Sequence, residues 1–370
     1  MLAYLRLSLE AAGQRKYPEP LHPYRNEFQR DRDRVIHSRA FRRLEGKTQV
    51  FAPGLSDHFR NRLTHTIEVA QIARTVACVL ELNEEFTETL ALAHDIGHPP
   101  FAHAGEHELN LQMQQFGLGF EHNLHSLRLV DHLERRYASF DGLNLTFEVR
   151  EGIVKHSREV EAGTVGALGE FLPGLKPPLE AQLLDIADEI AYNTADLDDA
   201  FTAGLIGLEQ MAAAMPFISK RAEETATMFP ASDERIRFNE IQRSVINTLV
   251  GGFIEGTFRK AEVEKVRTVE DVRYAKGRLA ALTDEAAVLN RQLRALLSAA
   301  LYDSDALIEH RRSAATKVSW LFNHFLEHPE HIPSNFRDSL EKEPLPRVVC
   351  DYIAGMTDGF FLKTYEQFAQ

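Results

Sequence analysis

The sequence has 370 residues, of which 44% are hydrophobic and 26% are charged. This balance is typical of a globular protein and excludes a disordered or membrane-embedded chain, and no apolar run approaches the length that spans a bilayer. The opening MLAYLRLSLE lacks the features of a signal peptide. Two cysteines, Cys78 and Cys350, suit a reducing compartment. We therefore expect a cytoplasmic protein that has no membrane partner.

The formal net charge is -13, which disfavours binding of a polyanion to the surface as a whole. The segment 25–62 is different, because it holds ten Lys or Arg and five Asp or Glu. Its arginines favour phosphate binding, since the guanidinium group presents a rigid fork of donors. An amphipathic helix with internal Asp–Arg pairs gives the same pattern. Taken alone, the segment favours this second interpretation.

In chain order, residues 1–24 contain three prolines and little periodicity, which predicts an extended arm. The apolar spacing predicts a helix over 26–44, and the chain then breaks at PGLSDH, residues 53–58. A helix over 62–82 is apolar around most of its circumference and is therefore expected to be buried. The short helix that follows must stop near Gly97, because the prolines after it cannot continue a helix.

The remaining elements follow from the same periodicity. We predict helices over 102–116, 122–137 and 179–201, a small hairpin over 141–147, and a loop or lid over the Gly- and Pro-rich stretch 161–178. Helical segments continue to Gln370. The sequence therefore predicts an all-α fold with at most a small β-hairpin.

The motif HDIGH at 94–98 places an imidazole and a carboxylate side by side at the end of a buried helix. Adjacent helical positions diverge by about 100 degrees, so both side chains reach one ion only near a helix end. Imidazole with carboxylate suits Mn, Fe, Zn or Mg. By itself, however, His94 is better explained as a core histidine bonded to a backbone carbonyl.

Three further features favour a metal site. His65 lies on the apolar stripe of the buried 62–82 helix, where an imidazole without a partner is costly. Five polar residues share one face of the 179–201 helix: Asp185, Asp188, Tyr192, Asp196 and Asp199. Finally, five histidines and Glu106 crowd into residues 98–125. This density is hard to explain by packing alone.

Five segments carry a family resemblance: QRDRDRVIHSRAFRRLEGKTQVF, NRLTHTIEVAQIAR, ALAHDIGHPPFAHAGE, FEHN and LLDIADEIAY. In this order they resemble the deoxynucleoside triphosphate triphosphohydrolases of the HD superfamily, the deoxyguanosine-triphosphatase-like proteins of bacteria. The resemblance runs from about residue 24 to 200, and the later helices are similar to the associated C-terminal region of that family. It implies three regions: an N-terminal arm and basic helix (1–59), the HD metal-phosphohydrolase core (60–205), and a helical HD-associated region (206–370).

The resemblance also implies roles for individual residues. His65, His94, Asp95 and Asp188 would bind a divalent metal ion, Mg or Mn, with Fe, Co or Zn as alternatives. His103 and Glu106 would form the catalytic pair, and His122 would contact the α-phosphate or the leaving oxygen. The substrate contacts would come from four residues: Arg62 for phosphate, and Gln49, Tyr192 and Asp196 for the deoxyribose.

The implied reaction is hydrolysis of dGTP, and of other dNTPs, to a deoxynucleoside and tripolyphosphate. Two alternatives stay open. The chain could be an HD phosphohydrolase acting on another nucleotide phosphoester, or a dNTP-sensing or single-strand-binding protein with secondary hydrolysis. The resemblance further implies a dNTP effector and a homo-oligomer, a tetramer or hexamer. Nucleic acid would bind only if such an oligomer gathered its basic segments into one groove.

Overall fold

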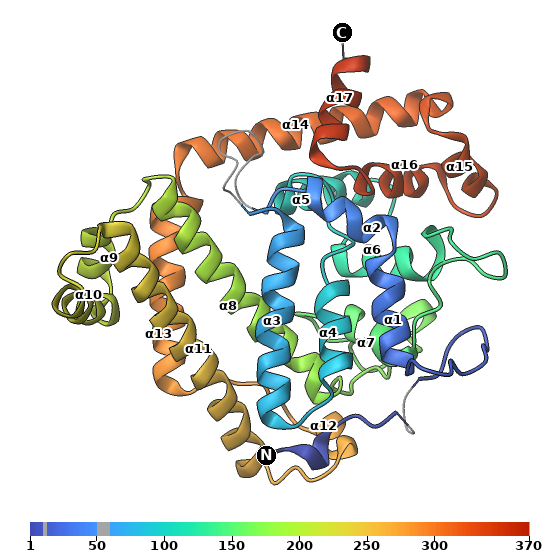
Figure 1. The fold of residues 1–370 in the computed structure, drawn as a ribbon. Helices are drawn as coiled ribbons and strands as arrows, with labels where there is room; N and C mark the ends of the chain where they lie inside the picture. The colour runs from blue at the N-terminus through green and yellow to red at the C-terminus, as the bar shows by residue number, and fades with distance from the viewer. Residues whose placement is uncertain (10–12, 50–59, 370) are drawn as a thin grey trace. The chain divides into compact units, whose positions relative to one another are not determined.

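A computed structural model describes residues 1–9, 13–49 and 60–369 (Figure 1). These residues form helices joined by loops, and their β-type contacts are three isolated bridges, which confirms the all-α fold. The predicted hairpin over 141–147 is wrong. Gly142 and Thr146 each make a single bridge, to Arg135 and Arg15, and α7 already begins at Phe147. The predicted chain break at 53–58 lies outside the described residues.

The chain divides into two compact units. Unit 1 comprises 1–11, 68–91 and 159–307, and unit 2 comprises 12–67, 92–158 and 308–370. Three helices contribute residues to both units: α3 (Arg62–Leu80), α4 (Glu84–Ala93) and α14 (Asp305–Glu327). None of the described helices is long and apolar enough to cross a lipid bilayer.

Unit 1 is built around α8, which packs with α11 and α13 (Figure 1). Its further helices are η1 (Ala3–Leu5), η4 (Gly166–Leu168), α8 (Leu179–Thr202), α9 (Leu208–Ala214), α10 (Pro216–Met228), α11 (Glu234–Val263), α12 (Val269–Tyr274), α13 (Asp284–Leu297) and η5 (Ser298–Tyr302). The predicted helix over 179–201 is thus confirmed. The stretch 161–178 is a loop with one short helical turn, η4, as its glycines and prolines predicted.

The first nine residues are packed into unit 1 and do not form part of the predicted extended arm. Leu2, Leu5 and Leu7 are buried, and the Leu2 amide donates to the Leu80 carbonyl (2.8 Å). The sequence prediction missed this because three leucines spaced two or three residues apart fit neither a long helix nor a strand.

Unit 2 contains the histidine-rich segments. Its helices are α1 (Glu27–Ile36), α2 (Arg39–Arg43), η2 (Leu44–Gly46), α5 (Ala102–Gln114), α6 (His122–Arg128), η3 (Leu129–Leu133), α7 (Phe147–Val154), η6 (Pro329–His331), α15 (Ser334–Arg337), η7 (Asp338–Glu341), α16 (Leu345–Ala354) and α17 (Asp358–Phe368). The predicted helix over 102–116 therefore ends two residues early. The one over 122–137 is α6 continued by η3 and ends four residues early, at Leu133.

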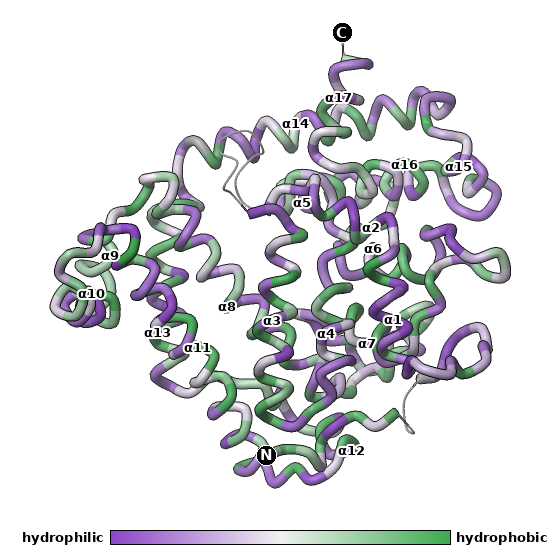
Figure 2. Tube along the Cα trace, in the orientation of Figure 1, coloured by the Kyte–Doolittle hydropathy of each residue, from purple (hydrophilic) through white to green (hydrophobic). Residues whose placement is uncertain are grey.

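The predicted helix over 26–44 is two helices, because Ser38 starts a new one. The Ser38 side chain accepts from the Phe41 amide, an N-cap bond that ends the preceding helix. On the strongly hydrophilic α1 (Figure 2), Arg30 pairs with Glu27 (2.8 Å) and Arg34 with Glu19 (2.8 Å). Ion pairs thus account for these arginines, within the helix for Arg30 and with the segment before the helix for Arg34.

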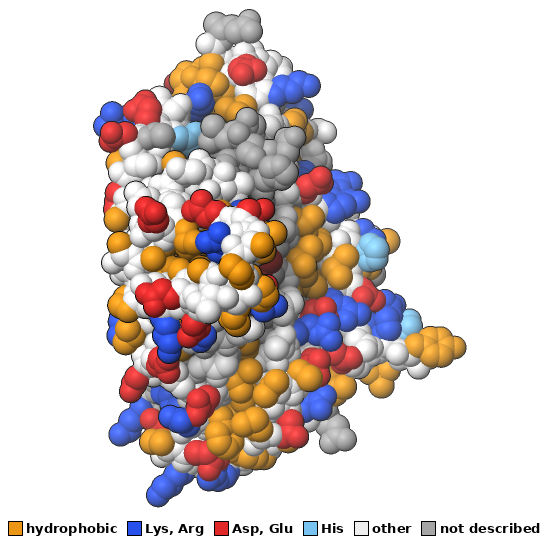
Figure 3. All heavy atoms as spheres, turned by 60° about the vertical axis from the view of Figure 1, so that its left-hand side comes forward, with side chains coloured by type: hydrophobic (Ala, Val, Ile, Leu, Met, Phe, Trp, Pro, Cys, Tyr) orange, Lys and Arg blue, Asp and Glu red, His pale blue; other side chains and the backbone are white. Residues whose placement is uncertain are grey.

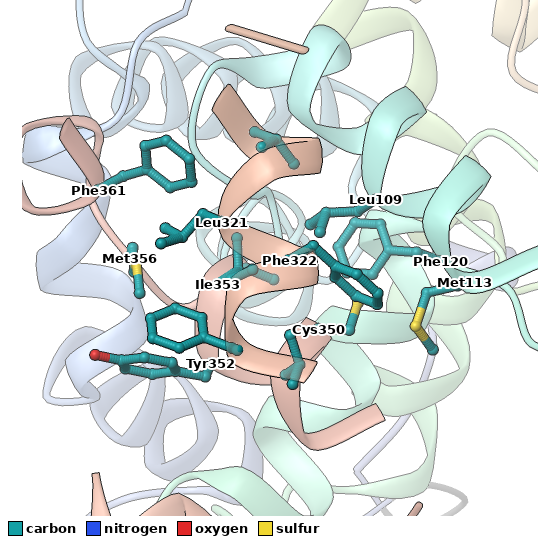
Figure 4. Packing of buried hydrophobic residues seen from close by; sticks show 14 of the residues in the cluster. Leu109, Met113, Phe120, Leu321, Phe322, Cys350, Tyr352, Ile353, Met356 and Phe361 are labelled. Atoms are coloured by element: carbon teal, nitrogen blue, oxygen red, sulfur yellow. The ribbon is translucent and has the colours of Figure 1, made fainter. Parts of the chain in front are cut away.

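A hydrophobic core joins α5 to the C-terminal helices of unit 2 (Figure 4). Leu109 and Met113 of α5, Phe322 of α14 and Ile353 of α16 are all fully buried in it. Burial of each side chain of this size stabilises the folded state by about 1.5–3 kcal/mol. The helix that carries His103 and Glu106 is therefore held in place by the C-terminal segment.

Candidate active site

His94 and Asp95 lie in the turn that directly follows α4, as the prolines after them predicted. Both are buried. Gly97 allows this turn to press against α6, because a Cβ there would lie 2.3 Å from both the His122 carbonyl oxygen and the Ser126 amide nitrogen. The Gly97 amide also donates to Ser126 Oγ (2.9 Å). The glycine of HDIGH is thus required by a close backbone approach.

Three of the predicted metal ligands converge in unit 2. His65 from α3 meets His94 and Asp95, and one donor atom from each lies within 4.8 Å of the others. The two imidazole rings cross edge to face, with centroids 5.9 Å apart. Two imidazoles and a carboxylate, all buried, fit a divalent transition metal ion.

Asp95 is held ionised by its surroundings. Burial by itself would raise its pKa, but His94, His98 and Arg62 outweigh burial and hold the pKa of Asp95 well below its ordinary value. Arg62 Nη1 lies 2.5 Å from Asp95 Oδ2. Arg62, predicted to bind phosphate, therefore bonds directly to a predicted metal ligand.

His98 is a member of this cluster to which the sequence analysis gave no role. Its Nδ1 lies 3.0 Å from Asp95 Oδ1, and its ring stacks on that of His122 with centroids 3.9 Å apart. Burial and the nearby Arg62 keep the pKa of His98 well below its ordinary value. His98 Nε2 has no hydrogen-bond partner among the described residues.

Glu106 of α5 contacts two histidines. The predicted partner, His103, has its Nδ1 3.4 Å from Glu106 Oε2. The contact with His122 is closer, because both the amide and Nδ1 of His122 lie near Glu106 Oε1, at 2.8 and 2.7 Å. Burial would raise the pKa of Glu106, but the bonds from the histidines hold it well below its ordinary value. The predicted catalytic pair is therefore a carboxylate with two histidines.

A buried polar network supports the backbone around these residues. The Lys47 ammonium donates to the carbonyls of His98 and Ala354, and burial lowers the pKa of Lys47 to about 7. Asp358, at the start of α17, accepts from the Thr48 amide (2.9 Å) and the Phe101 amide (3.1 Å).

Phe101 and the next residue, Ala102, adopt left-handed backbone angles, with φ of 62° and 52°. In the left-handed region, a residue other than glycine costs about 1–3 kcal/mol. The bond from the Phe101 amide to Asp358 therefore holds a strained connection between HDIGH and α5.

Gln49 is buried and its Oε1 has no hydrogen-bond partner among the described residues. The neighbouring Val50–Phe59 segment lies outside those residues. The sugar contact predicted for Gln49 stays a prediction.

The remaining predicted site residues lie on α8 in unit 1. Asp196 is buried and accepts a hydrogen bond from the Tyr302 hydroxyl, and the rings of Tyr192 and Tyr302 stack with centroids 6.0 Å apart. Asp188 precedes Tyr192 by one helical turn and is partly buried. Tyr302 was missed by the sequence analysis, because it follows Asp196 by 106 residues and carries no motif.

Comparisons with known proteins agree with this geometry. The HD domain family matches residues 62–193, and the phosphohydrolase-associated domain family matches 280–367. Three proteins called deoxyguanosinetriphosphate triphosphohydrolase-like protein are similar along nearly the whole chain. That of Ralstonia nicotianae is 46% identical over 95% of this chain and 90% of its own length. Those of Geobacter sulfurreducens and Bordetella pertussis are 43% and 45% identical, over 99% and 95% of this chain and 94% and 92% of their own lengths. The chain therefore belongs to the family of deoxyguanosinetriphosphate triphosphohydrolase-like proteins, which are HD-domain phosphohydrolases.

Proposed function

We propose that this protein hydrolyses deoxynucleoside triphosphates, dGTP among them, to a deoxynucleoside and tripolyphosphate. The observation that carries the proposal is the meeting of two clusters in unit 2. One consists of His65, His94 and Asp95, and the other of Glu106 with His103 and His122. Together they offer sites for a cation and for proton transfer, which phosphoryl transfer requires.

His65, His94 and Asp95 would hold the divalent ion, and Asp188 would be the fourth ligand. Support for Asp188 comes from the family order of the motifs and from its place one turn before Tyr192. When bound, the ion supplies positive charge to the phosphate oxygens. We propose Mg or Mn, and the two imidazoles leave Fe, Co and Zn as alternatives.

Glu106 would orient both histidines and stabilise their protonated forms. Water attacks the α-phosphorus, the bond from that phosphorus to the 5′-oxygen breaks, and the leaving oxygen takes a proton. An imidazole polarised by an ionised carboxylate suits such proton transfer. We assign His103 to the attacking water and His122 to the leaving oxygen or the α-phosphate. Arg62 would contact phosphate in addition to Asp95.

The deoxyribose would bind along α8. Tyr192 and Asp196 lie about one and two helical turns after Asp188, so a sugar held there would bring its α-phosphate toward the ligand. Tyr302 supports this role, because its hydroxyl bonds Asp196 and its ring stacks on Tyr192. We propose that these aromatic rings exclude a 2′-hydroxyl, and that Gln49 adds a sugar contact.

From the same family we propose a cytoplasmic homo-oligomer, a tetramer or hexamer, that responds to a dNTP effector. Binding of nucleic acid finds less support. The net charge is -13, and positive and negative side chains are interspersed over the face seen in Figure 3. An even mixture of signs attracts a polyanion weakly.

Hydrolysis of dGTP in oxygen-18 water, followed by phosphorus NMR, tests the function. We expect the label in intact tripolyphosphate and none in deoxyguanosine. Orthophosphate with dGDP would overturn the proposal. Preferred turnover of a nucleoside monophosphate or a guanosine tetraphosphate would support the alternative phosphohydrolase. Tight dNTP binding without hydrolysis would support a sensor.

Asp188→Ala tests the fourth ligand in the same assay. This variant should lose bound metal and turnover while keeping its helical content, because the other ligands cannot close the coordination shell without it. Asp185→Ala is the matched control, since Asp185 lies one turn earlier on α8 and pairs with Arg278. Full metal content and a wild-type rate in Asp188→Ala would show that the ligand assignment is wrong.

A further inference from the structure

A second group of histidines, without a role in the proposed reaction, lies in unit 2 at the end of α14. His324, His328 and His331 fall within eight residues of a chain that holds 16 histidines. His324 lies in the last turn of α14, and His331 ends the short helix η6 that follows. Short histidine-rich tracts are typical of metal binding.

Two of these rings already face each other through nitrogen atoms. His324 Nε2 lies 2.9 Å from His331 Nδ1. Two imidazole nitrogens bound to one ion at 2.0–2.1 Å are separated by about 2.9 to 3.4 Å, depending on the angle at the metal. The two rings form a hydrogen bond in the structure, and the spacing of their nitrogens also falls within the range for two ligands of one ion.

The third ring lies beside both of them. The His328 centroid is 5.0 Å from that of His324 and 5.4 Å from that of His331. His328 directly follows α14 and precedes η6, so it lies on the connection between the other two histidines. His328 Nδ1 contacts Glu330 Oε1 (3.3 Å), so the exposed His328 side chain must rotate if it is to supply a third ligand.

Aromatic neighbours hold the first two rings in position. His324 stacks between Trp320 and Phe368, with centroids 5.0 and 4.7 Å away. His331 also stacks on Phe368, at 4.6 Å. A site whose ligands are fixed by packing loses little conformational entropy on binding. Phe368 belongs to α17, so the cluster connects α14 with the last helix.

The local charges favour a bound cation. Glu327 and Glu330 lie beside the rings, and the C-terminal end of a helix carries partial negative charge.

We propose that His324, His328 and His331 form a surface site for a divalent transition metal ion, of the Zn²⁺, Ni²⁺ or Cu²⁺ class. Imidazole ligands select these ions over Mg²⁺ and Ca²⁺. The site is separate from the cluster of His65, His94 and Asp95. A bound ion would link the end of α14 to η6 and would stabilise the packing of Phe368 on both rings.

The chain contains its own reporter for this site, because its single tryptophan is Trp320, which stacks on His324. Cu²⁺ at the site should quench the fluorescence of Trp320 with one equivalent of metal, and excess Zn²⁺ should reverse the quenching. His328→Ala and His331→Ala should each raise the Cu²⁺ concentration needed by tenfold or more. Neither variant removes the ring that touches Trp320.

Two controls separate this site from the proposed active site. His94→Ala should keep the quenching, and His107→Ala, an exposed histidine outside both clusters, should behave as the wild type. Native mass spectrometry should find one bound Zn²⁺ fewer in His331→Ala, and His331→Gln repeats the test with a polar side chain. An unquenched wild type, or equal quenching in the wild type and both alanine variants, would overturn the proposal.

Discussion

Glu106 is the residue on which most of the proposed proton chemistry depends. It is largely shielded from water and accepts from the amide and the ring of His122, while it also lies within 3.4 Å of His103. An imidazole that is paired through Nδ1 with an ionised carboxylate is fixed in one tautomer. Both histidines of the proposed catalytic group would therefore lose their orientation if this carboxylate were removed.

We expect His122→Ala and His103→Ala each to reduce kcat for dGTP by about 10²-fold or more, the usual effect of losing a proton-transfer group. Glu106→Gln should reduce kcat at least as much as either, because the neutral amide cannot stabilise a protonated ring. Residues that act as one unit are non-additive, so Glu106→Gln with His122→Ala should be no worse than the more damaging single change. Initial rates at saturating dGTP measure kcat for the single variants and for the double variant. Full additivity would mean that the two residues act independently.

At the scale of elements, the contact between the HDIGH turn and α6 sets the position of His94 and Asp95, two of the predicted metal ligands. A methyl group at Gly97 would meet the α6 backbone at 2.3 Å, and neither a carbonyl oxygen nor an amide nitrogen of a helix can move far. Gly97→Ala should therefore destabilise the fold by about 1–3 kcal/mol, as overpacking does, and should lower metal affinity.

The control is Gly251→Ala in α11. A Cβ at Gly251 meets no heavy atom within 4 Å among the described residues, and alanine is favoured over glycine in a helix. This variant should be neutral or slightly stabilised. Thermal unfolding and metal titration of both variants test the expectation, and equal melting temperatures would contradict the steric role of Gly97.

The link from Asp358 to the start of α5 gives a second expectation at this scale. Asp358→Asn replaces one acceptor oxygen by an NH₂ group, which would then face the amide donor of Thr48 or Phe101. A buried donor left without its acceptor costs about 1–3 kcal/mol. We therefore expect a lower melting temperature, together with a reduced kcat, because α5 carries His103 and Glu106.

Asp351→Asn serves as the comparison for Asp358→Asn. Asp351 is another buried carboxylate of unit 2 and bonds Arg128 (2.6 Å) rather than the backbone before α5. It should lower the melting temperature with a smaller effect on kcat at temperatures where the protein stays folded. A kcat loss of the same size in both variants would show that Asp358 acts through stability alone.

Local patterns in the sequence were sufficient for part of this description. The 3.6-residue spacing of α8 and the two prolines after HDIGH predicted the helix and the turn, because both signals lie within a few residues. The break between α1 and α2 depends on one capping bond of Ser38, which competes with a continuous helical pattern. The bond between Asp358 and Thr48 joins residues 310 positions apart, and no local pattern indicates such a partner.

The same limit applies to the residues of the site. His65, His94, Asp95, His103 and Glu106 were found because two motifs carry them. The contact of Glu106 with His122 and the pairing of Asp196 with Tyr302 required the fold. Asp188 stays a predicted ligand, since its place rests on the order of motifs in the family.

At the scale of the whole molecule, unit 2 is assembled from three separate stretches of chain. Its third stretch, 308–370, supplies Phe322, Phe325 and Ile353, which are fully buried. The predicted boundary between the regions 60–205 and 206–370 therefore separates residues that belong to one core, the core that supports α5. These regions remain predictions. An HD segment without the C-terminal helices would expose a large apolar surface.

This arrangement predicts that the catalytic half of the chain cannot fold without its end. A chain of residues 1–307 should express as aggregate or as a species that binds a hydrophobic dye.

In the full chain, Phe322→Ala should lower the free energy of unfolding by about 3–5 kcal/mol, the usual cost of removing a buried aromatic ring. Phe360→Ala is the matched control, because Phe360 on α17 is 50% exposed and its loss leaves no cavity. Denaturant unfolding, followed by circular dichroism, measures the stability of the 1–307 chain and of both variants. Dye binding reports the apolar surface that each exposes. A soluble, cooperatively unfolding 1–307 chain that still binds metal at His65, His94 and Asp95 would contradict the dependence of unit 2 on its C-terminal helices.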